Sequence, residues 1–361
     1  MSGLKVLLSG FDYDKKISLY TIFQDTIADT SFINGASIQK FEQQFAEHSH
    51  GKRCIATGNC TDSLRMCLQA YGIGPKDRVA VPSFTWLSTA EVVKQLWAEP
   101  VFVDVDDTMC MSPTDLERTL KQHNCKAVIA VDLFGNVADI DKLKAIALSY
   151  NCAFIQDSAQ STGAEYKGKG LGSCDHPVCY SFYPTKNLGT WGDAGAVVCD
   201  DFFGEKIKQL RNHGQGAEKF ISTDIGWNSR MDSIHADILL NKLPHLDQWN
   251  NKRRANAKLY QDNIKIAHNT QTINQDCKPV WHQYVITVSE PTKVQQALEQ
   301  AGVQSRVYYK VPIHKLSTYK TNQDLPYTDL LSCTNISIPV HQYLTEDDIG
   351  LIIDIVNKVK L

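Results

Sequence analysis

The chain has 361 residues, of which 43% are hydrophobic and 21% are charged. This composition is typical of a globular protein with a large core, and it excludes an intrinsically disordered chain. Lysine and arginine number 37 and aspartate and glutamate 40, which gives a formal net charge of −3. Such a chain has no general electrostatic attraction to nucleic acids or anionic membranes.

The eleven cysteines are scattered singly, without a C-x-x-C pair. Their odd number and their spacing favour free, mostly buried thiols in a reducing cytoplasm over disulfides or a zinc site. The only apolar run near the N-terminus is Val6-Leu7-Leu8, and no later stretch is long enough to span a bilayer. We therefore predict a cytoplasmic protein. No spacing in the chain leads us to predict a metal.

From about residue 52 to residue 200, short β-rich runs alternate with helical patterns. Several of these runs are continuously apolar, which indicates strands that are buried on both faces, as in a mainly parallel sheet covered by helices. Periodicity predicts helices over 61–71 and 139–150, and Ser112-Pro113 is typical of the start of a third. The predicted strands are 53–57, 78–82, 101–105, 127–133, 152–156, 178–182 and 195–199.

After residue 200 the pattern changes to longer helices and a smaller α+β segment. We predict helices over 202–211, 233–246, 249–263, 292–302 and 345–359, and strands over 283–288 and 305–309. The sequence thus indicates two domains. The first comprises an N-terminal arm and a large α/β domain over residues 1–245, and the second is a smaller C-terminal α+β domain over residues 246–361.

Three pieces of sequence carry candidate chemistry. Asp157-Ser158-Ala159-Gln160 comes at the end of a predicted strand, where open α/β sheets bind ligands. Twenty-nine residues after Asp157, Lys186 stands in a run that follows the next predicted strand. Upstream, Asn59-Cys60-Thr61-Asp62 places small polar residues at the start of a helix.

The order and spacing of these pieces resemble a fold-type I pyridoxal phosphate (PLP) enzyme. The wording of residues 181–196, Ser-Phe-Tyr-Pro-Thr-Lys-Asn-Leu-Gly followed by Gly-Asp-Ala-Gly-Ala, is similar to the DegT/StrS family of nucleotide-sugar aminotransferases. The likeness extends from Phe32 to His341. It implies an α/β fold, in which a large domain with a mainly parallel, mixed sheet covered by helices is joined to a smaller C-terminal α+β domain.

The resemblance implies two catalytic residues. Lys186 would bond covalently to the PLP aldehyde and later carry a proton, for which its ordinary pKa of about 10.4 must be lowered by desolvation. Asp157 would hold the pyridine nitrogen of PLP protonated, which makes the cofactor an electron sink. The competing interpretations are a surface lysine in a loop and an aspartate that caps the next turn.

The resemblance also implies further cofactor contacts. The backbone amides of Thr61 and Asp62, at a helix N-terminus, and the hydroxyl of Ser181 would bind the phosphate. Trp86 would stack on the pyridine ring, and Gln160 would contact the phenolic oxygen. Asn228 would reach the phosphate from a neighbouring subunit, which makes the enzyme a homodimer whose active sites are completed in trans.

The chain departs from the family pattern at two places. Cys60 stands where the family usually has glycine. Its Cβ hinders a close approach of the backbone to the phosphate, and its thiol would lie beside the phosphate, open to oxidation. Tyr308 and Lys310 replace a histidine and a proline in the stretch that faces the substrate. Tyr309 and His314 are therefore only weak candidates for substrate contacts.

The resemblance implies that an amino group moves from L-glutamate to a nucleotide-linked keto sugar. The sequence around Lys186 is similar to that of the branch acting on 3-keto sugars, which favours a dTDP-linked 3-keto-6-deoxyhexose. A 4-keto sugar is the alternative substrate. Two other possibilities are a PLP-dependent sugar dehydratase, although relatives of that kind have histidine in place of Lys186, and a non-catalytic PLP-binding regulator.

Overall fold

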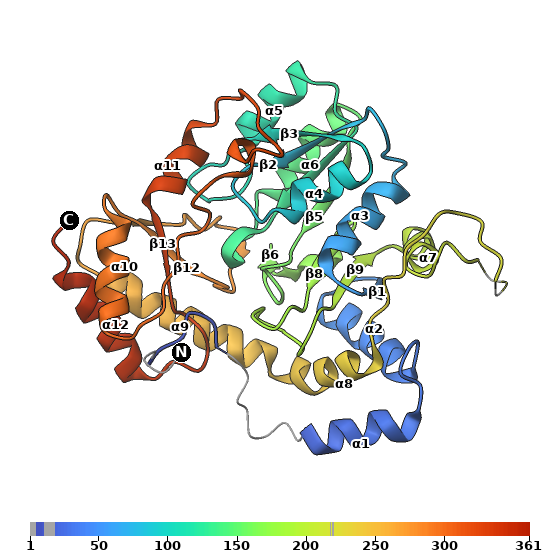
Figure 1. Ribbon diagram of the computed structural model, residues 1–361, viewed down its shortest axis with the longest axis horizontal. Helices are drawn as coiled ribbons and strands as arrows, with labels where there is room; N and C mark the ends of the chain where they lie inside the picture. Colours follow the sequence, from blue (N-terminus) through green and yellow to red (C-terminus); the bar gives the residue numbers. More distant parts are fainter. Residues whose placement is uncertain (1–4, 11–18, 217, 219) are drawn as a thin grey trace.

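The computed structural model describes residues 5–10, 19–216, 218 and 220–361 (Figure 1). Its centre is a seven-stranded sheet with the order β1-β9-β8-β5-β4-β2-β3, in which β9 runs antiparallel to both of its neighbours and the other pairs are parallel. All seven predicted strands are present, with ends shifted by no more than two residues. They are β1 (Arg53–Thr57), β2 (Arg78–Pro82), β3 (Glu99–Val103), β4 (Ala127–Val131), β5 (Ala153–Asp157), β8 (Val178–Ser181) and β9 (Gly195–Cys199).

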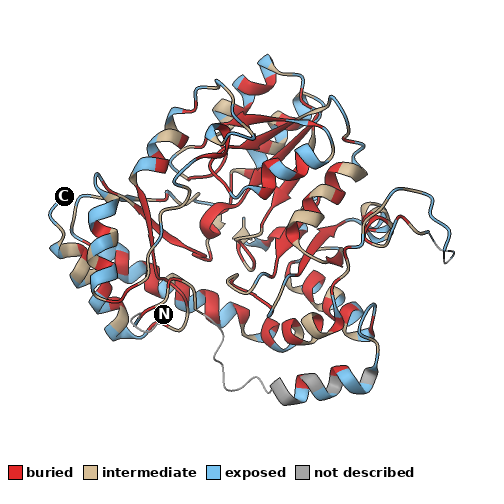
Figure 2. Ribbon diagram, in the orientation of Figure 1, coloured by how far each residue is buried: buried red, intermediate tan, exposed pale blue. Residues whose placement is uncertain are grey.

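Helices cover both faces of this sheet, because successive strand side chains point to opposite sides. In β4, Val128 and Ala130 belong to one hydrophobic cluster while Ala127 and Ile129 belong to the other. Figure 2 shows the strands buried almost throughout, whereas the helices carry one buried and one exposed face. The first cluster includes α2 (Ala36–His48), α5 (Pro113–Gln122), α6 (Ile140–Ser149) and α8 (Ser233–Lys242), and the second includes α3 (Cys60–Ala70), α4 (Ser88–Gln95) and α7 (Asp201–Leu210).

A second sheet of three antiparallel strands lies in the C-terminal part, with the order β10-β12-β13. It has its own hydrophobic cluster, to which the helices α9, α10 and α12 contribute. The elements are β10 (Asn269–Thr270), β12 (Tyr284–Thr287), β13 (Asn335–Ile338), α9 (Leu246–Asn263), α10 (Pro291–Gln300) and α12 (Glu346–Lys358). Short 3-10 turns and small elements complete the described part: α1 (Leu19–Asp29), α11 (Pro326–Thr334), β6 (Glu165–Tyr166), β7 (Lys169–Gly170) and β11 (Cys277–Lys278).

The predicted strand over 305–309 is wrong. Within it, Arg306 forms a single bridge with Ser337, and the chain then leaves the small sheet. The reason is tertiary packing, because the ring of Tyr309 lies against Phe84 and Phe134 of the large sheet's core. Further along, Ile313 and Leu325 also pack in the cluster beside α3 and α4.

The predicted boundary near residue 246 falls where α8, a 3-10 turn (Leu243–His245) and α9 follow one another directly. Part of the C-terminal segment packs with the large sheet and part with the small sheet. The division into residues 1–245 and 246–361 therefore stays a prediction. Within the described part of the chain, no helix combines the length and the apolar character that crossing a membrane requires.

Candidate active site

The candidate site lies at the carboxyl ends of two adjacent parallel strands. Asp157 is the last residue of β5 and Ser181 the last residue of β8, and Lys186 follows in the loop after β8. The start of α3 reaches the same place, since Cys60 Sγ lies 3.9 Å from Asp157 Oδ1. The fold therefore brings the three separate sequence pieces together at one edge of the sheet.

Lys186 and Asp157 are close enough for each charge to affect the pKa of the other. Burial raises the pKa of Asp157, while the amide of Ala159, which donates to Oδ1 at 3.0 Å, and the positive charge of Lys186 oppose that rise. Burial lowers the pKa of the Lys186 amine, and the charge of Asp157 opposes that change. A lysine in this environment loses its proton more readily than a free lysine, as its predicted role requires.

A buried amide network fixes the loop that carries Lys186. Asn187 donates through Nδ2 to Asn250 Oδ1 (2.8 Å) and to the carbonyl of Val280 (3.0 Å). Its Oδ1 lies 3.1 Å from His282 Nδ1. An amide oxygen can only accept, so His282 must carry its proton on Nδ1. Sequence reasoning missed this network. Only the adjacency of Asn187 to Lys186 could have suggested it.

Gln160 lies among aromatic rings. Its Oε1 accepts a hydrogen bond from the amide of Phe134 (2.8 Å), and its Nε2 lies 3.4 Å from the Tyr309 hydroxyl. The rings of Tyr309 and Trp86 are 6.4 Å apart. Trp86 is 57% exposed, so a flat ligand could stack on its face. The structure thus places Gln160, Trp86 and Tyr309 together.

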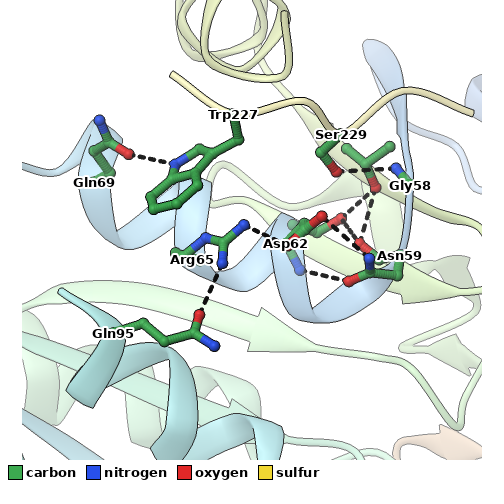
Figure 3. Close-up of polar contacts among 10 residues, drawn as sticks. Gly58, Asn59, Asp62, Arg65, Gln69, Gln95, Trp227 and Ser229 are labelled. Carbon is green, nitrogen blue, oxygen red and sulfur yellow. Dashed lines mark hydrogen bonds and ion pairs between the residues drawn. The ribbon is translucent and has the colours of Figure 1, made fainter. Parts of the chain in front are cut away.

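The N-terminus of α3 has a polar cap (Figure 3). Asn59 Oδ1 accepts a hydrogen bond from the amide of Asp62 (2.8 Å), and Arg65 Nη2 lies 2.5 Å from Asp62 Oδ1. Of the two amides predicted to bind phosphate, that of Asp62 is therefore already occupied, and it could bind phosphate only after Asn59 turned away. Gly195 allows β9 to approach this point, because a Cβ there would lie 2.5 Å from the carbonyl carbon of Asn59.

The segment that contains Asn228 is anchored to α3 of its own chain (Figure 3). The Arg65 guanidinium lies 3.6 Å from the centroid of the Trp227 ring, and Trp227 Nε1 donates to Gln69 Oε1 at 2.8 Å. Ser229 Oγ accepts a hydrogen bond from the amide of Gly58 (3.1 Å). Asn228 itself is exposed between these anchors. Its contact with a cofactor in a neighbouring subunit stays a prediction.

The remaining candidates lie differently. Ser181 is buried at the end of β8, where its Oγ accepts a hydrogen bond from the amide of Tyr183 (3.4 Å). His314 is also buried, with Nδ1 2.7 Å from Ser83 Oγ and its ring beside that of Phe102. His314 contacts the core and Asp329, whose Oδ1 lies 3.5 Å from its Nε2, whereas Tyr309 contacts Gln160.

These groups fit PLP by the chemistry of their donors. The site offers an amine for the aldehyde, a buried carboxylate for the pyridine nitrogen and an exposed indole face for the ring. It also offers a side-chain amide for the phenolic oxygen and a helix N-terminus for the phosphate. Among the described residues, no group of three or more His, Cys, Asp or Glu side chains could hold a metal ion.

Comparison with known proteins identifies the family. Residues 18–357 match the model of the DegT/DnrJ/EryC1/StrS aminotransferase family. The chain belongs to this family. It is a PLP-dependent aminotransferase with the α/β fold predicted from its sequence.

Individual relatives share nearly the whole chain. A pleiotropic regulatory protein of Geobacillus stearothermophilus is 34% identical, covering 92% of this chain and 91% of its own. The UDP-2-acetamido-2-deoxy-3-oxo-D-glucuronate aminotransferase of Pseudomonas aeruginosa is 35% identical, covering 91% and 92%. The crystal structure of DesV of S. venezuelae with a ketimine intermediate superposes with a TM-score of 0.90 at 29% identity, covering 94% and 93%.

Proposed function

We propose that the enzyme moves an amino group from L-glutamate to a nucleotide-linked 3-keto sugar, with a dTDP-linked 3-keto-6-deoxyhexose as the favoured substrate. The observation that carries the proposal is the pairing of Lys186 with the buried carboxylate of Asp157 at the ends of adjacent strands. The sequence of residues 181–196 supports a 3-keto sugar as the substrate. So does the 3-oxo sugar in the name of the Pseudomonas aeruginosa relative.

Each residue has a definite task in this proposal. When bound, PLP supplies an electron sink that makes the adjacent carbon–hydrogen bond of the substrate acidic. Lys186 Nζ takes up that proton and returns it, which its lowered pKa favours. The Asp157 carboxylate would accept a hydrogen bond from the protonated pyridine nitrogen, and Gln160 Nε2 would donate to the phenolic oxygen. Trp86, which is 57% exposed, would stack on the pyridine ring.

The proposal includes a homodimer, in which Asn228 would reach the phosphate of the neighbouring subunit. Within the same subunit Ser181 and Thr61 would bind the phosphate, and the amide of Asp62 would join them once the Asn59 side chain has turned away. The exposed position of Asn228 on a segment anchored to α3 supports this arrangement. The proposal also includes a reducing, cytoplasmic setting, which is supported by the finding that all eleven cysteines are free thiols.

Two measurements test this proposal. Borohydride reduction of the PLP-loaded protein, followed by peptide mass spectrometry, should find the cofactor mass on Lys186. The variant Lys186→Ala should lose it, and Lys252→Ala, which removes an exposed lysine of α9, should keep it. Separately, the enzyme is incubated with L-glutamate and a panel of dTDP- and UDP-linked 3-keto and 4-keto sugars, and amino sugars are detected by mass.

We expect turnover of the 3-keto sugars, with the dTDP-linked 6-deoxyhexose best. Preferential turnover of a 4-keto sugar would overturn the choice of carbon. Loss of a hydroxyl group without gain of nitrogen would indicate a dehydratase. Cofactor bound at Lys186 with no turnover of any sugar would favour a regulator, a role that the name of the Geobacillus relative suggests for that protein.

A further inference from the structure

A buried carboxylate that the proposed mechanism does not use lies beside Asp157. Asp132 follows β4 directly, and it is fully buried. Its Oδ2 accepts hydrogen bonds from Ser158 Oγ (2.6 Å) and Gln156 Nε2 (2.7 Å), and its Oδ1 accepts one from the amide of Ala138 (3.0 Å). An ionisable side chain at this depth is rare unless its partners compensate for the lost water.

Asp132 bonds to the turn formed by residues 157–161 at three points. Its backbone amide donates to the carbonyl of Asp157 (2.9 Å), which extends the pairing of β4 with β5. Its carboxylate accepts the hydrogen bond from Ser158. Its carbonyl accepts one from Ser161 Oγ (3.0 Å). The two serines, both fully buried, thus fasten the turn on either side of Ala159 and Gln160.

This turn carries two of the residues that would bind PLP. Asp157 precedes Ser158 directly, and Gln160 lies between the two fastened serines. On the far side, Gln156 Oε1 lies 2.9 Å from His176 Nε2, so the bonded chain continues from Asp132 through Gln156 to His176. An amide oxygen can only accept, so His176 donates here, and the Gln156 amide is oriented with its Nε2 toward Asp132.

We propose that Asp132 is a positioning residue, which holds Asp157 and Gln160 at the angle and distance that PLP requires. This inference rests on the proposed roles of Asp157 and Gln160. Residues that orient a ligating side chain through hydrogen bonds typically change affinity by about 10- to 100-fold at metal sites. Asp132 would act in the same way, because its hydrogen bonds orient the turn that carries Asp157.

The test uses the full-length protein and PLP itself as the probe. The dissociation constant of PLP is measured by its absorption and by protein fluorescence for Asp132→Ala, Ser158→Ala and the double variant. Asp132→Ala removes the whole acceptor, whereas Ser158→Ala removes only its bond to the turn. Ser332→Ala is the matched control, because it deletes a buried hydroxyl that bonds its own helix in α11.

We expect each single variant to weaken PLP binding about tenfold and to alter the pH dependence of the visible absorption of the bound cofactor. The double variant should bind PLP no more weakly than Asp132→Ala, because both substitutions break the same hydrogen bond between Ser158 and Asp132. The variant Asp132→Asn, which keeps an acceptor for Ala138, should recover part of the affinity. The control should bind PLP like the wild type.

Unchanged PLP affinity and absorption in both single variants, with a lowered melting temperature alone, would show that Asp132 only stabilises the fold. Where Asp132→Ala does not yield folded protein, Ser158→Ala decides the question on its own. Failure of the proposed function is distinguishable, because it would appear in the wild-type chain, either as PLP that does not bond to Lys186 or as bound PLP without turnover of a 3-keto sugar, whereas this test compares the PLP affinity of variants with that of the wild type.

Discussion

The thiol of Cys60 points toward the carboxylate of Asp157, with Sγ 3.9 Å from Oδ1. The first turn of α3 accepts this cysteine without strain, since a residue in regular helical conformation needs no glycine. Burial and the neighbouring charge of Asp157 raise the pKa of the thiol well above its ordinary value. The structure therefore disfavours the reactive thiol beside the phosphate that the sequence suggested.

We predict that Cys60 resists alkylation. Iodoacetamide at pH 8 should label the exposed Cys333 first, while Cys60 stays unmodified as long as the protein is folded. Peptide mass spectrometry over time measures both rates. The variant Cys60→Ala should bind PLP within about threefold of the wild type, because a thiol is a weak hydrogen-bond donor. Rapid labelling of Cys60 with loss of PLP would contradict this account.

The bonds of Asn187 lead to a second prediction. Asn187→Ala leaves the Nδ1–H of His282 and the Oδ1 of Asn250 without their partner in the interior. We expect the free energy of unfolding to fall by about 3 kcal/mol, since each buried polar group without a partner costs about 1–3 kcal/mol. Urea unfolding of the protein without cofactor measures this loss.

The same variant should also retain less PLP, because the loop of Lys186 loses its anchor. Asn241→Ala is the control, since it removes an exposed asparagine of α8 whose amide bonds only its own helix. If Asn187→Ala loses stability but keeps full PLP occupancy after gel filtration, the network supports the fold and not the lysine.

The sequence predicted those features that neighbouring residues determine, and it missed those that depend on contacts between residues far apart in the chain. The large sheet could be predicted because its strands are continuously apolar, and Asp157 and Lys186 could be placed together because parallel strands end at one edge. Asp132 and His282 gave no such signal, since their partners Ser158 and Asn187 lie far away in the sequence. The predicted strand over 305–309 failed for the same reason, because Tyr309 packs against a distant core.

Buried histidines should make the protein less stable in acid. Burial lowers the pKa of His176 from 6.5 to about 4, and the pKa of His341 falls to about 4 for the same reason. As the pH falls below about 6.5, the unfolded chain binds protons that the folded chain cannot bind, so stability declines until about pH 4. Burial raises the pKa of Asp132 to about 7, which acts in the opposite direction over the same range.

We predict that His176→Gln weakens this acid sensitivity. Glutamine can still donate to Gln156 but does not titrate, so about 2 kcal/mol of the loss at pH 5 should disappear. Melting temperatures between pH 4.5 and 7.5 measure the effect. His213→Asn, at an exposed position with φ of 59° that asparagine tolerates, serves as the control. Parallel curves for His176→Gln and the wild type would show that His176 takes up its proton as readily in the folded protein as in the unfolded chain.

The proposed contribution of Asn228 across subunits can be tested with mixed dimers. The variants Lys186→Ala and Asn228→Ala are each impaired when pure, because every site then lacks one group. In a hybrid dimer whose sites are completed in trans, one site combines both mutations and the other has neither. Random mixing of equal amounts makes half of the dimers hybrids, and one of the two sites in each hybrid is intact. About a quarter of all sites should therefore be active.

The two variants are mixed after partial denaturation and return to native buffer, and amino-sugar production is compared with the mean of the unmixed variants. Wild type mixed with itself through the same steps controls for recovery. If Asn228 acts within its own chain, the site that keeps Lys186 still carries Asn228→Ala. The mixture would then show only the mean activity of its two components, and the assignment across subunits would be wrong.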